Sequence, residues 1–487
     1  MTTKKLILSL LALLVSMAAG AQEPYAVLSS DNKALTFYYD DQKASRNGMD
    51  VGPFSSSYDM NLWITIIDSG WFEQRESITS VVFDDSFAGC STLTSTAFWF
   101  WELRNLTSIT GIKNLKTDNV TNMRSMFRGC SGLKSLDVSG FKTDNVINMN
   151  EMFSGCYGLK SLDVSGFKTE NVESMSYMFA GCYGLTSLDV SGFKTENVKD
   201  MISMFAYCSA LTSLDVSGFK TDNVTDMTYM FRGCSGLTSL DVSGFKTDKV
   251  RSMDSMFSDC SGLTSLDVTG FKTDNVTDMG GMFSGCSGLT SLDVTGFKTD
   301  KVWTMGSMFS DCSGLTSLDV TGFKTDNVED MSNMFSGCSG LTSLDVSGFK
   351  TDNVTSMGGM FYGCSGLTSL DLSSFKTDKV TDMDAMFSGC SALTTIYAGE
   401  GWSTSKVQDS GDMFYECKSL VGGAGTKYKY FNKNHTYAHI DGGIDNPGYF
   451  TRKAGGTGEW AEGDLNHDGK VDAADIVYLT NLILNQK

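Results

Sequence analysis

The sequence predicts an α/β repeat solenoid, in which each coil holds one short parallel strand and one short helix. The first observation is a 26-residue unit that recurs head to tail through the middle of the 487-residue chain. The unit is seen in pure form from Met230 to Ser255, as MFRGCSGLTSLDVSGFKTDKVRSMDS. A fixed period of roughly 20 to 50 residues is typical of stacked-repeat proteins.

The second observation is that cysteine marks the period. Eleven of the 13 cysteines are 26 residues apart: Cys130, Cys156, Cys182, Cys208, Cys234, Cys260, Cys286, Cys312, Cys338, Cys364 and Cys390. An exported protein could form disulfides. However, the number of cysteines is odd, and stacked parallel side chains do not present the dihedral angle that a disulfide needs. Leu103 also takes the cysteine place in a degenerate early repeat. We therefore expect a buried ladder of reduced thiols that fills space.

Two hydrophobic periodicities alternate within the unit. The stretch from Leu237 to Val242 follows L-x-x-L-x-V, the strand spacing of leucine-rich repeats. From Val250 to Cys260 apolar residues are three, three, one and three apart, which predicts a short helix with Thr247 or Asp248 as its N-cap. The methionines of this stripe are expected in the core rather than in a binding groove.

The N-terminus predicts export. Lys4 and Lys5 precede the apolar run 6–15, and Ala19-Gly20-Ala21 fits a cleavage site, so residues 1–21 form a signal peptide. The apolar run is short for a membrane anchor, and no later stretch approaches a transmembrane length. We expect a secreted or cell-surface protein whose mature chain has no transmembrane segment.

The other segments cap and extend the stack, because an open solenoid end exposes apolar surface and strand edges. The expected order is an N-terminal β-rich cap at 22–86, the solenoid at 87–420, a C-terminal cap at 421–450, a Gly/Thr-rich linker at 451–463 and a calcium-binding tail at 464–487. Strands are predicted in the first cap at 26–28, 35–39 and 78–83. The aromatic run 98–101 could stack on sugars, but its place in the first coils favours packing against the cap.

The predicted strands carry a column of aspartates on their exposed face. The candidate ligand face consists of Asp137, Asp163, Asp189, Asp215, Asp241, Asp267, Asp293, Asp319, Asp345 and Asp371. Like charges in register repel, so this column either is satisfied by neighbouring Ser/Thr hydroxyls and water or attracts a cation or ligand. Its uniformity suits a repetitive protein or glycan ligand, weak multivalent contact or a simple spacer.

The tail has the spacing D-x-N-x-D-G-x-x-D-x-x-D, that of a twelve-residue calcium loop. The expected Ca2+ ligands are Asp464, Asn466, Asp468, the carbonyl of Lys470, Asp472 and Asp475. The apolar positions 476, 479, 482 and 483 predict an amphipathic helix after the loop.

Composition excludes several function classes. The net charge of −19, without a local Lys/Arg run, disfavours nucleic acid and anionic membranes as partners. Only three histidines occur, and no nucleophile motif, phosphate loop or zinc spacing is present. We expect no enzymatic activity and no catalytic residues.

The pattern M-F-x-x-C-x-x-L-x-x-L-D-V-S-G-F-x-T-x-x-V-x-x-M resembles the repeat of BspA-like bacterial surface leucine-rich-repeat proteins, over about residues 87–420. Residues 422–450 resemble the piece that follows such arrays. The single calcium loop, with Asp475 at position 12, is similar to one half of a dockerin. These resemblances imply an exported surface protein for adhesion or partner binding. The alternative is an accessory component of an extracellular polysaccharide-degrading complex, docked to a cohesin-like scaffold.

Overall fold

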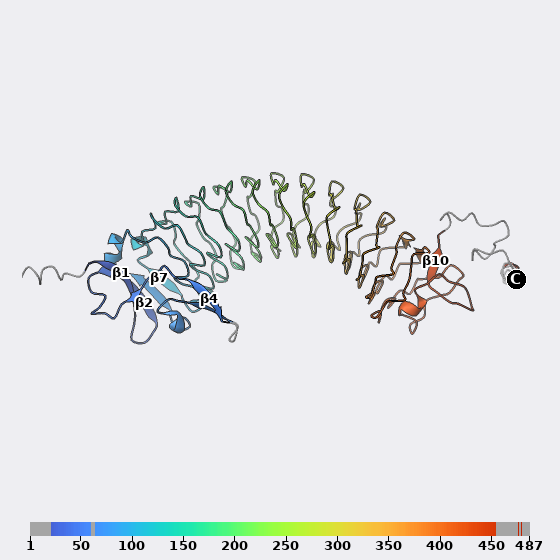
Figure 1. The fold of residues 1–487 in the computed structure, drawn as a ribbon, viewed down its shortest axis with the longest axis horizontal. Helices are drawn as coiled ribbons and strands as arrows, with labels where there is room; N and C mark the ends of the chain where they lie inside the picture. Colours follow the sequence, from blue (N-terminus) through green and yellow to red (C-terminus); the bar gives the residue numbers. More distant parts are fainter. Residues whose placement is uncertain (1–20, 60–63, 454–475, 477–478, 480–487) are drawn as a thin grey trace, which may run out of the picture. The chain divides into compact units, whose positions relative to one another are not determined.

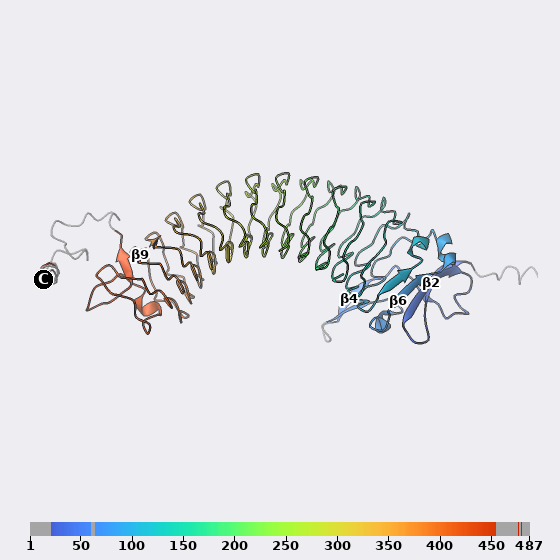
Figure 2. The same cartoon turned by 180° about the vertical axis from the view of Figure 1, so that it is seen from behind.

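The computed structural model describes residues 21–59, 64–453, 476 and 479. Contacts divide the chain into two compact units, Met1–Val224 with Cys234–Leu237 and Thr225–Gly233 with Thr238–Lys487. Within each unit, successive coils lie side by side, as both views show (Figures 1 and 2). The prediction of a repeat solenoid is therefore confirmed.

The first unit begins with a five-stranded sheet of order β3-β1-β2-β6-β7. The strands β1 (Glu23–Leu28) and β2 (Ala34–Asp40) pair antiparallel, and β6 (Ser80–Phe83) and β7 (Ser108–Thr110) extend the sheet in parallel. The strands predicted in this region are confirmed. The shorter elements are β3 (Met49–Asp50), β4 (Ser56–Asp59), β5 (Ile64–Ile67), and the 3-10 helices η1 (Phe72–Gln74), η2 (Asp85–Gly89) and η3 (Ile112–Asn114).

Aromatic side chains join this sheet to the first coil. Trp99 and Phe100 are fully buried, and the ring of Phe37 stacks on Trp99 with centroids 5.0 Å apart. The indole nitrogen of Trp71 donates to the Trp99 carbonyl at 3.0 Å, and that of Trp99 donates to the Val51 carbonyl at 2.9 Å. The aromatic run therefore packs against the cap, as expected, and offers no open platform for a sugar.

Each coil adds one layer to a continuous apolar core. Met149, Met152, Phe153 and Cys156 of one coil are completely buried. The ring of Phe153 stacks on that of Phe127 in the preceding coil, 5.7 Å away and within 3° of parallel. The methionines thus lie in the core, and burial of these columns drives the stacking of coils.

The predicted helix in each coil is wrong. Over residues 115–434, all of which the structure describes, no helix is present. In the segment 149–156 the amides of Met149, Glu151 and Phe153 donate to carbonyls of the next coil, at 3.2, 2.9 and 2.9 Å. Of the amides between them, that of Asn150 bonds to the side-chain oxygen of Asn148 at 2.9 Å, and that of Met152 bonds three residues back to Met149 O at 3.2 Å.

The three-residue spacing of the apolar stripe therefore reflects three-residue turns. An α-helix would keep these amides bonded within the segment, whereas here every second one leaves it. Glu151 and Gly155 have φ values of 59° and 73°, and left-handed residues at these two places interrupt a right-handed helix.

The predicted strand is present in only part of the array. The second unit ends in a parallel sheet formed by β8 (Ser369–Leu372), β9 (Thr395–Ala398) and β10 (Phe450–Arg452). Over residues 115–368, again fully described, no strand is assigned, although side chains still alternate between buried and exposed. The coils are bridged there through the turn segments, for instance Asn122 to Asn148 and Asn148 to Ser174.

The segment after the array contains the 3-10 helix η4 (His435–Tyr437) and the buried carboxylate of Asp441. Asp441 accepts hydrogen bonds from the amides of Ala424, Thr426 and Gly443 at 2.9, 2.9 and 3.0 Å. Burial favours a raised pKa, but these bonds and one from the Thr426 hydroxyl outweigh it, so the Asp441 pKa is lowered. The charged carboxylate therefore holds this terminal segment together.

A buried threonine joins each coil to the next. The hydroxyl of Thr195 donates to the Lys220 carbonyl at 2.9 Å and accepts from the Lys220 amide at 2.7 Å. Thr247, expected as a helix N-cap, instead donates to the carbonyl of Lys272 at 2.9 Å. The capping interpretation is wrong because there is no helix to cap.

The cysteines are buried free thiols, as predicted. The thiol of Cys156 donates to the carbonyl of Phe127 in the preceding coil at 3.1 Å, so it is a hydrogen-bond donor as well as a filler. Burial raises the pKa of Cys234 to about 12, which keeps this thiol protonated at neutral pH.

Replacement of Thr195 by Val should lower the free energy of unfolding by about 1–3 kcal/mol, because it leaves two part-buried backbone groups of Lys220 without their partner in the protein. Urea unfolding monitored by circular dichroism measures this loss. Thr212 is exposed, and its replacement by Val should change stability by less than about 0.5 kcal/mol. If both substitutions lowered stability equally, the proposed role of Thr195 in joining two coils would be contradicted.

The native protein should not react with a disulfide-based thiol reagent at neutral pH, because its 13 thiols are buried and the shifted ones are protonated. All 13 should react once guanidinium unfolds the chain. The absorbance of the released thiolate counts them. Rapid labelling in the native state, or fewer than 13 thiols in the unfolded state, would argue against a reduced buried ladder.

Candidate functional site

The structure contains two repeated polar surfaces. The first is the aspartate face, the ten aspartates predicted from the sequence. All are exposed except Asp371, which is partly buried. The neighbouring Leu and Val side chains point into the core, as Leu162 and Val164 do beside Asp163.

Each aspartate on this face is held by the Ser or Thr two residues later. In Asp163, Oδ1 accepts from the Ser165 amide at 3.0 Å and from the Ser165 hydroxyl at 2.6 Å. Asp267 and Thr269 make the same pair at 3.0 and 2.7 Å. The local hydroxyl and amide thus hold one carboxylate oxygen, Oδ1, in every coil.

These bonds stabilise the ionised carboxylate at several positions of the face. The hydrogen bonds from the Ser191 hydroxyl and amide lower the pKa of Asp189, and those from Ser165 lower the pKa of Asp163. The neighbouring carboxylates at 163 and 215 raise the pKa of Asp189 by less than these bonds lower it. Repulsion between coils is therefore weaker than the local stabilisation.

One aspartate of this face forms an ion pair within the protein. At the end of the second unit the ammonium group of Lys453 donates to Oδ2 of Asp371, whose Oδ1 is already bonded to Ser373. At this position of the aspartate face, Oδ2 thus accepts a cationic donor from the protein itself.

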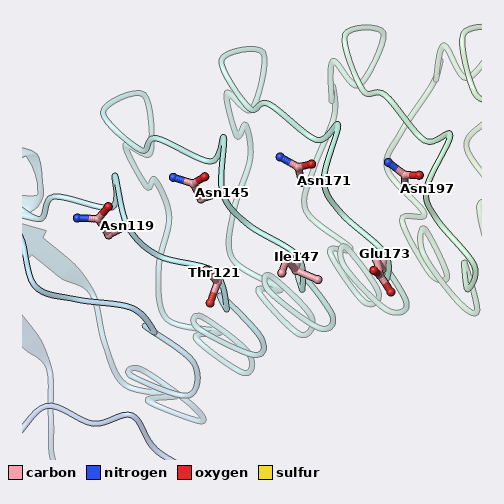
Figure 3. A pocket seen from close by; sticks show the side chains of 7 residues that line it. All are labelled: Asn119, Thr121, Asn145, Ile147, Asn171, Glu173 and Asn197. Carbon is pink, nitrogen blue, oxygen red and sulfur yellow. The ribbon is translucent and has the colours of Figure 1, made fainter.

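The second surface is the asparagine groove, a 680 Å³ hollow in the first unit (Figure 3). One row consists of asparagines in four successive coils, and the facing row holds Thr121, Ile147 and Glu173 (Figure 3). The asparagines are Asn119, Asn145, Asn171 and Asn197. Sequence reasoning missed this groove, although an uninterrupted run of asparagine at one repeat position was available as a signal.

All four asparagines have the same orientation because each amide nitrogen bonds to the preceding coil. Nδ2 of Asn145 donates to the Asp118 carbonyl at 2.8 Å, and Nδ2 of Asn171 donates to the Asp144 carbonyl at 2.7 Å. The carboxamide oxygens are thereby left as a row of acceptors, one per coil.

The expected calcium ligands from Asp464 to Asp475 lie outside the described residues. Among the residues that are described, no group of three or more His, Cys, Asp or Glu side chains is placed to hold a metal ion. In the same part of the chain, no helix has the length and apolarity needed to cross a membrane.

Comparison with known families gives one assignment. The family model described as "Mycoplasma protein of unknown function, DUF285" matches residues 94–213, 183–267, 253–367 and 305–424. Together these matches span more than half of the chain, so the chain belongs to the DUF285 family. No curated protein matches it.

Similar solved structures include a leucine-rich repeat protein from Bacteroides ovatus, 15% identical with a TM-score of 0.33, covering 82% of this chain and 92% of the other. A leucine rich cell surface protein from Faecalibacterium prausnitzii is 17% identical with a TM-score of 0.35, covering 81% and 100%. A leucine-rich repeat protein from Eubacterium ventriosum is 14% identical with a TM-score of 0.33, covering 88% and 100%.

Proposed function

We propose that the protein is an exported, non-catalytic surface scaffold that binds protein or glycan partners through the aspartate face of its solenoid. The observation that carries this proposal is the identical, locally fixed carboxylate that each coil presents. A partner then meets preorganised acceptors, so ordering them costs little on binding. The signal-peptide pattern at 1–21 and the BspA-like repeat pattern support display outside the cell.

The contact between Lys453 and Asp371 supports a partner that carries hydrogen-bond donors, ammonium groups among them. A partner that presents ammonium, amide or hydroxyl donors at regular intervals can engage several coils at once, so weak contacts add up to useful avidity. The strongly acidic chain, with a net charge of −19, favours neutral or basic partners over polyanions.

The test is a triple replacement of Asp163, Asp189 and Asp215 by Asn. Asparagine keeps the Oδ1 acceptor for Ser165 and its equivalents but removes the charge, so the coil conformation should persist. Binding of the mature protein to a printed glycan array and to immobilised extracellular proteins should weaken by about tenfold or more.

The matched control for this test replaces three exposed aspartates that lie off the face and away from the asparagine groove, Asp222, Asp248 and Asp274, by Asn. This control variant loses the same number of charges as the test variant. Because its replaced residues lie off the aspartate face, its affinity should stay within about twofold of that of the native protein. An equal loss in both variants, or a full retention of binding by the first, would remove the aspartate face from the proposal.

We also propose that the tail binds Ca2+ through Asp464, Asn466, Asp468, the Lys470 carbonyl, Asp472 and Asp475. What supports this proposal is the spacing of hard oxygen ligands and Gly469 at the turn position. The calcium-bound tail would serve docking or anchoring.

Replacement of Asp472 by Ala should weaken calcium binding by the full chain at least about tenfold in calorimetry, because an acidic ligand is lost. Glu462 lies just before the loop, and its replacement by Ala is the control. Unchanged affinity in the Asp472 variant would refute the loop assignment. Capture of a scaffold protein by the full chain only with calcium, and not with chelator, would favour the alternative, a docked accessory of a polysaccharide-degrading complex.

A further inference from the structure

The asparagine groove is chemically unlike the aspartate face. Its acceptors are neutral carboxamide oxygens, and a side chain with apolar surface, Ile147, lies in the facing row with 47% of its area exposed. No donor within the described residues reaches the carboxamide oxygens of Asn119, Asn145, Asn171 and Asn197. The groove therefore offers a row of oriented acceptors beside a patch of aliphatic surface.

The second unit shows which donor this kind of oxygen accepts. There, lysine takes the asparagine place in some coils, and its ammonium group reaches back to the asparagine one coil earlier. Nζ of Lys301 donates to Oδ1 of Asn275 at 2.8 Å, and Nζ of Lys379 donates to Oδ1 of Asn353 at 2.7 Å. In two coils, therefore, a lysine ammonium group donates to the asparagine Oδ1. In the described part of the chain, the same atom has no such donor in the asparagines of the groove.

The groove is where this internal donor is missing. From 119 to 223 this position holds asparagine in five successive coils, so no lysine follows any of the four asparagines that line the groove. An exposed acidic residue precedes each asparagine, at 118, 144, 170 and 196, and Glu173 lines the facing row. Lys199 pairs with Glu173 at 2.7 Å, and an exposed lysine also lies two residues before each acidic one, so the attraction for cations is moderated.

Spacing narrows the class of ligand. The stacked phenyl rings of successive coils are 5.7 Å apart in this unit. A linear polyamine carries its nitrogens on short methylene runs at a similar interval, and those methylenes can lie on Ile147. The net negative charge of the chain disfavours polymers that carry phosphate. A neutral sugar has no ammonium group, the donor that Asn275 and Asn353 accept in the second unit.

We propose that the asparagine groove binds a linear polyamine, with successive ammonium groups on the carboxamide oxygens of successive coils. This site shares no residue with the aspartate face, so the proposal goes beyond the partner binding proposed above and can fail without affecting it.

The test measures spermine binding to the mature protein by calorimetry at low ionic strength, comparing Asn171→Lys with Asn327→Lys. A lysine at position 171 should donate to Oδ1 of Asn145, just as Lys301 donates to Oδ1 of Asn275. Its ammonium group would then take the place that an ammonium group of spermine would occupy. Affinity should fall at least about tenfold. Asn327→Lys adds the same charge in the second unit, outside the groove, and should change affinity less than about twofold.

The array already tolerates lysine at this position in three coils, so both variants should fold, and circular dichroism checks this. A similar loss in both variants would mean that spermine binds only to the overall negative charge, and it would overturn the proposal. Unchanged affinity in Asn171→Lys would do the same. Binding of maltotetraose, lost in Asn171→Lys, with no binding of spermine would reassign the groove to hydroxyl donors.

Discussion

The structure depends on backbone hydrogen bonds that pass from one coil to the next. In the segment 149–156 every second amide donates to the following coil, at distances of 2.7 to 3.2 Å. A coil on its own would leave these amides unpaired next to an apolar core, and unpaired buried amides are costly. No coil is therefore stable alone, and stability in each unit comes from the joints between coils, as in other quasi-one-dimensional proteins.

Two columns of buried side chains complete these joints. Thr195 satisfies both backbone groups of Lys220, and the thiol of Cys156 satisfies the carbonyl of Phe127. Buried polar groups strengthen a core only when all of them are paired, and here the repeat pairs them in the same way each time. Because the joint fixes how successive coils stack, both polar surfaces repeat once per coil.

Much of this architecture could be predicted from the sequence, because a 26-residue period and the burial pattern follow from residue identity alone. The helix could not, because apolar residues three apart fit both a helix and a series of three-residue turns, and only the destination of each amide separates the two. The aspartates were found because charge in register is conspicuous. The asparagine groove was missed because its signal, asparagine rather than lysine in five successive coils, has meaning only once Lys301 is seen on Asn275.

The joint between coils has the same form on both of its sides, since one set of positions donates and an equivalent set accepts about 25 residues later. An in-frame gain or loss of one whole repeat would therefore recreate the same bonds on either side of the change. A gain of a few residues would instead move methionine and cysteine out of the core columns and bring charged side chains into them. Such an array can change its reach in whole-coil steps during evolution, with its binding surfaces lengthened or shortened in proportion.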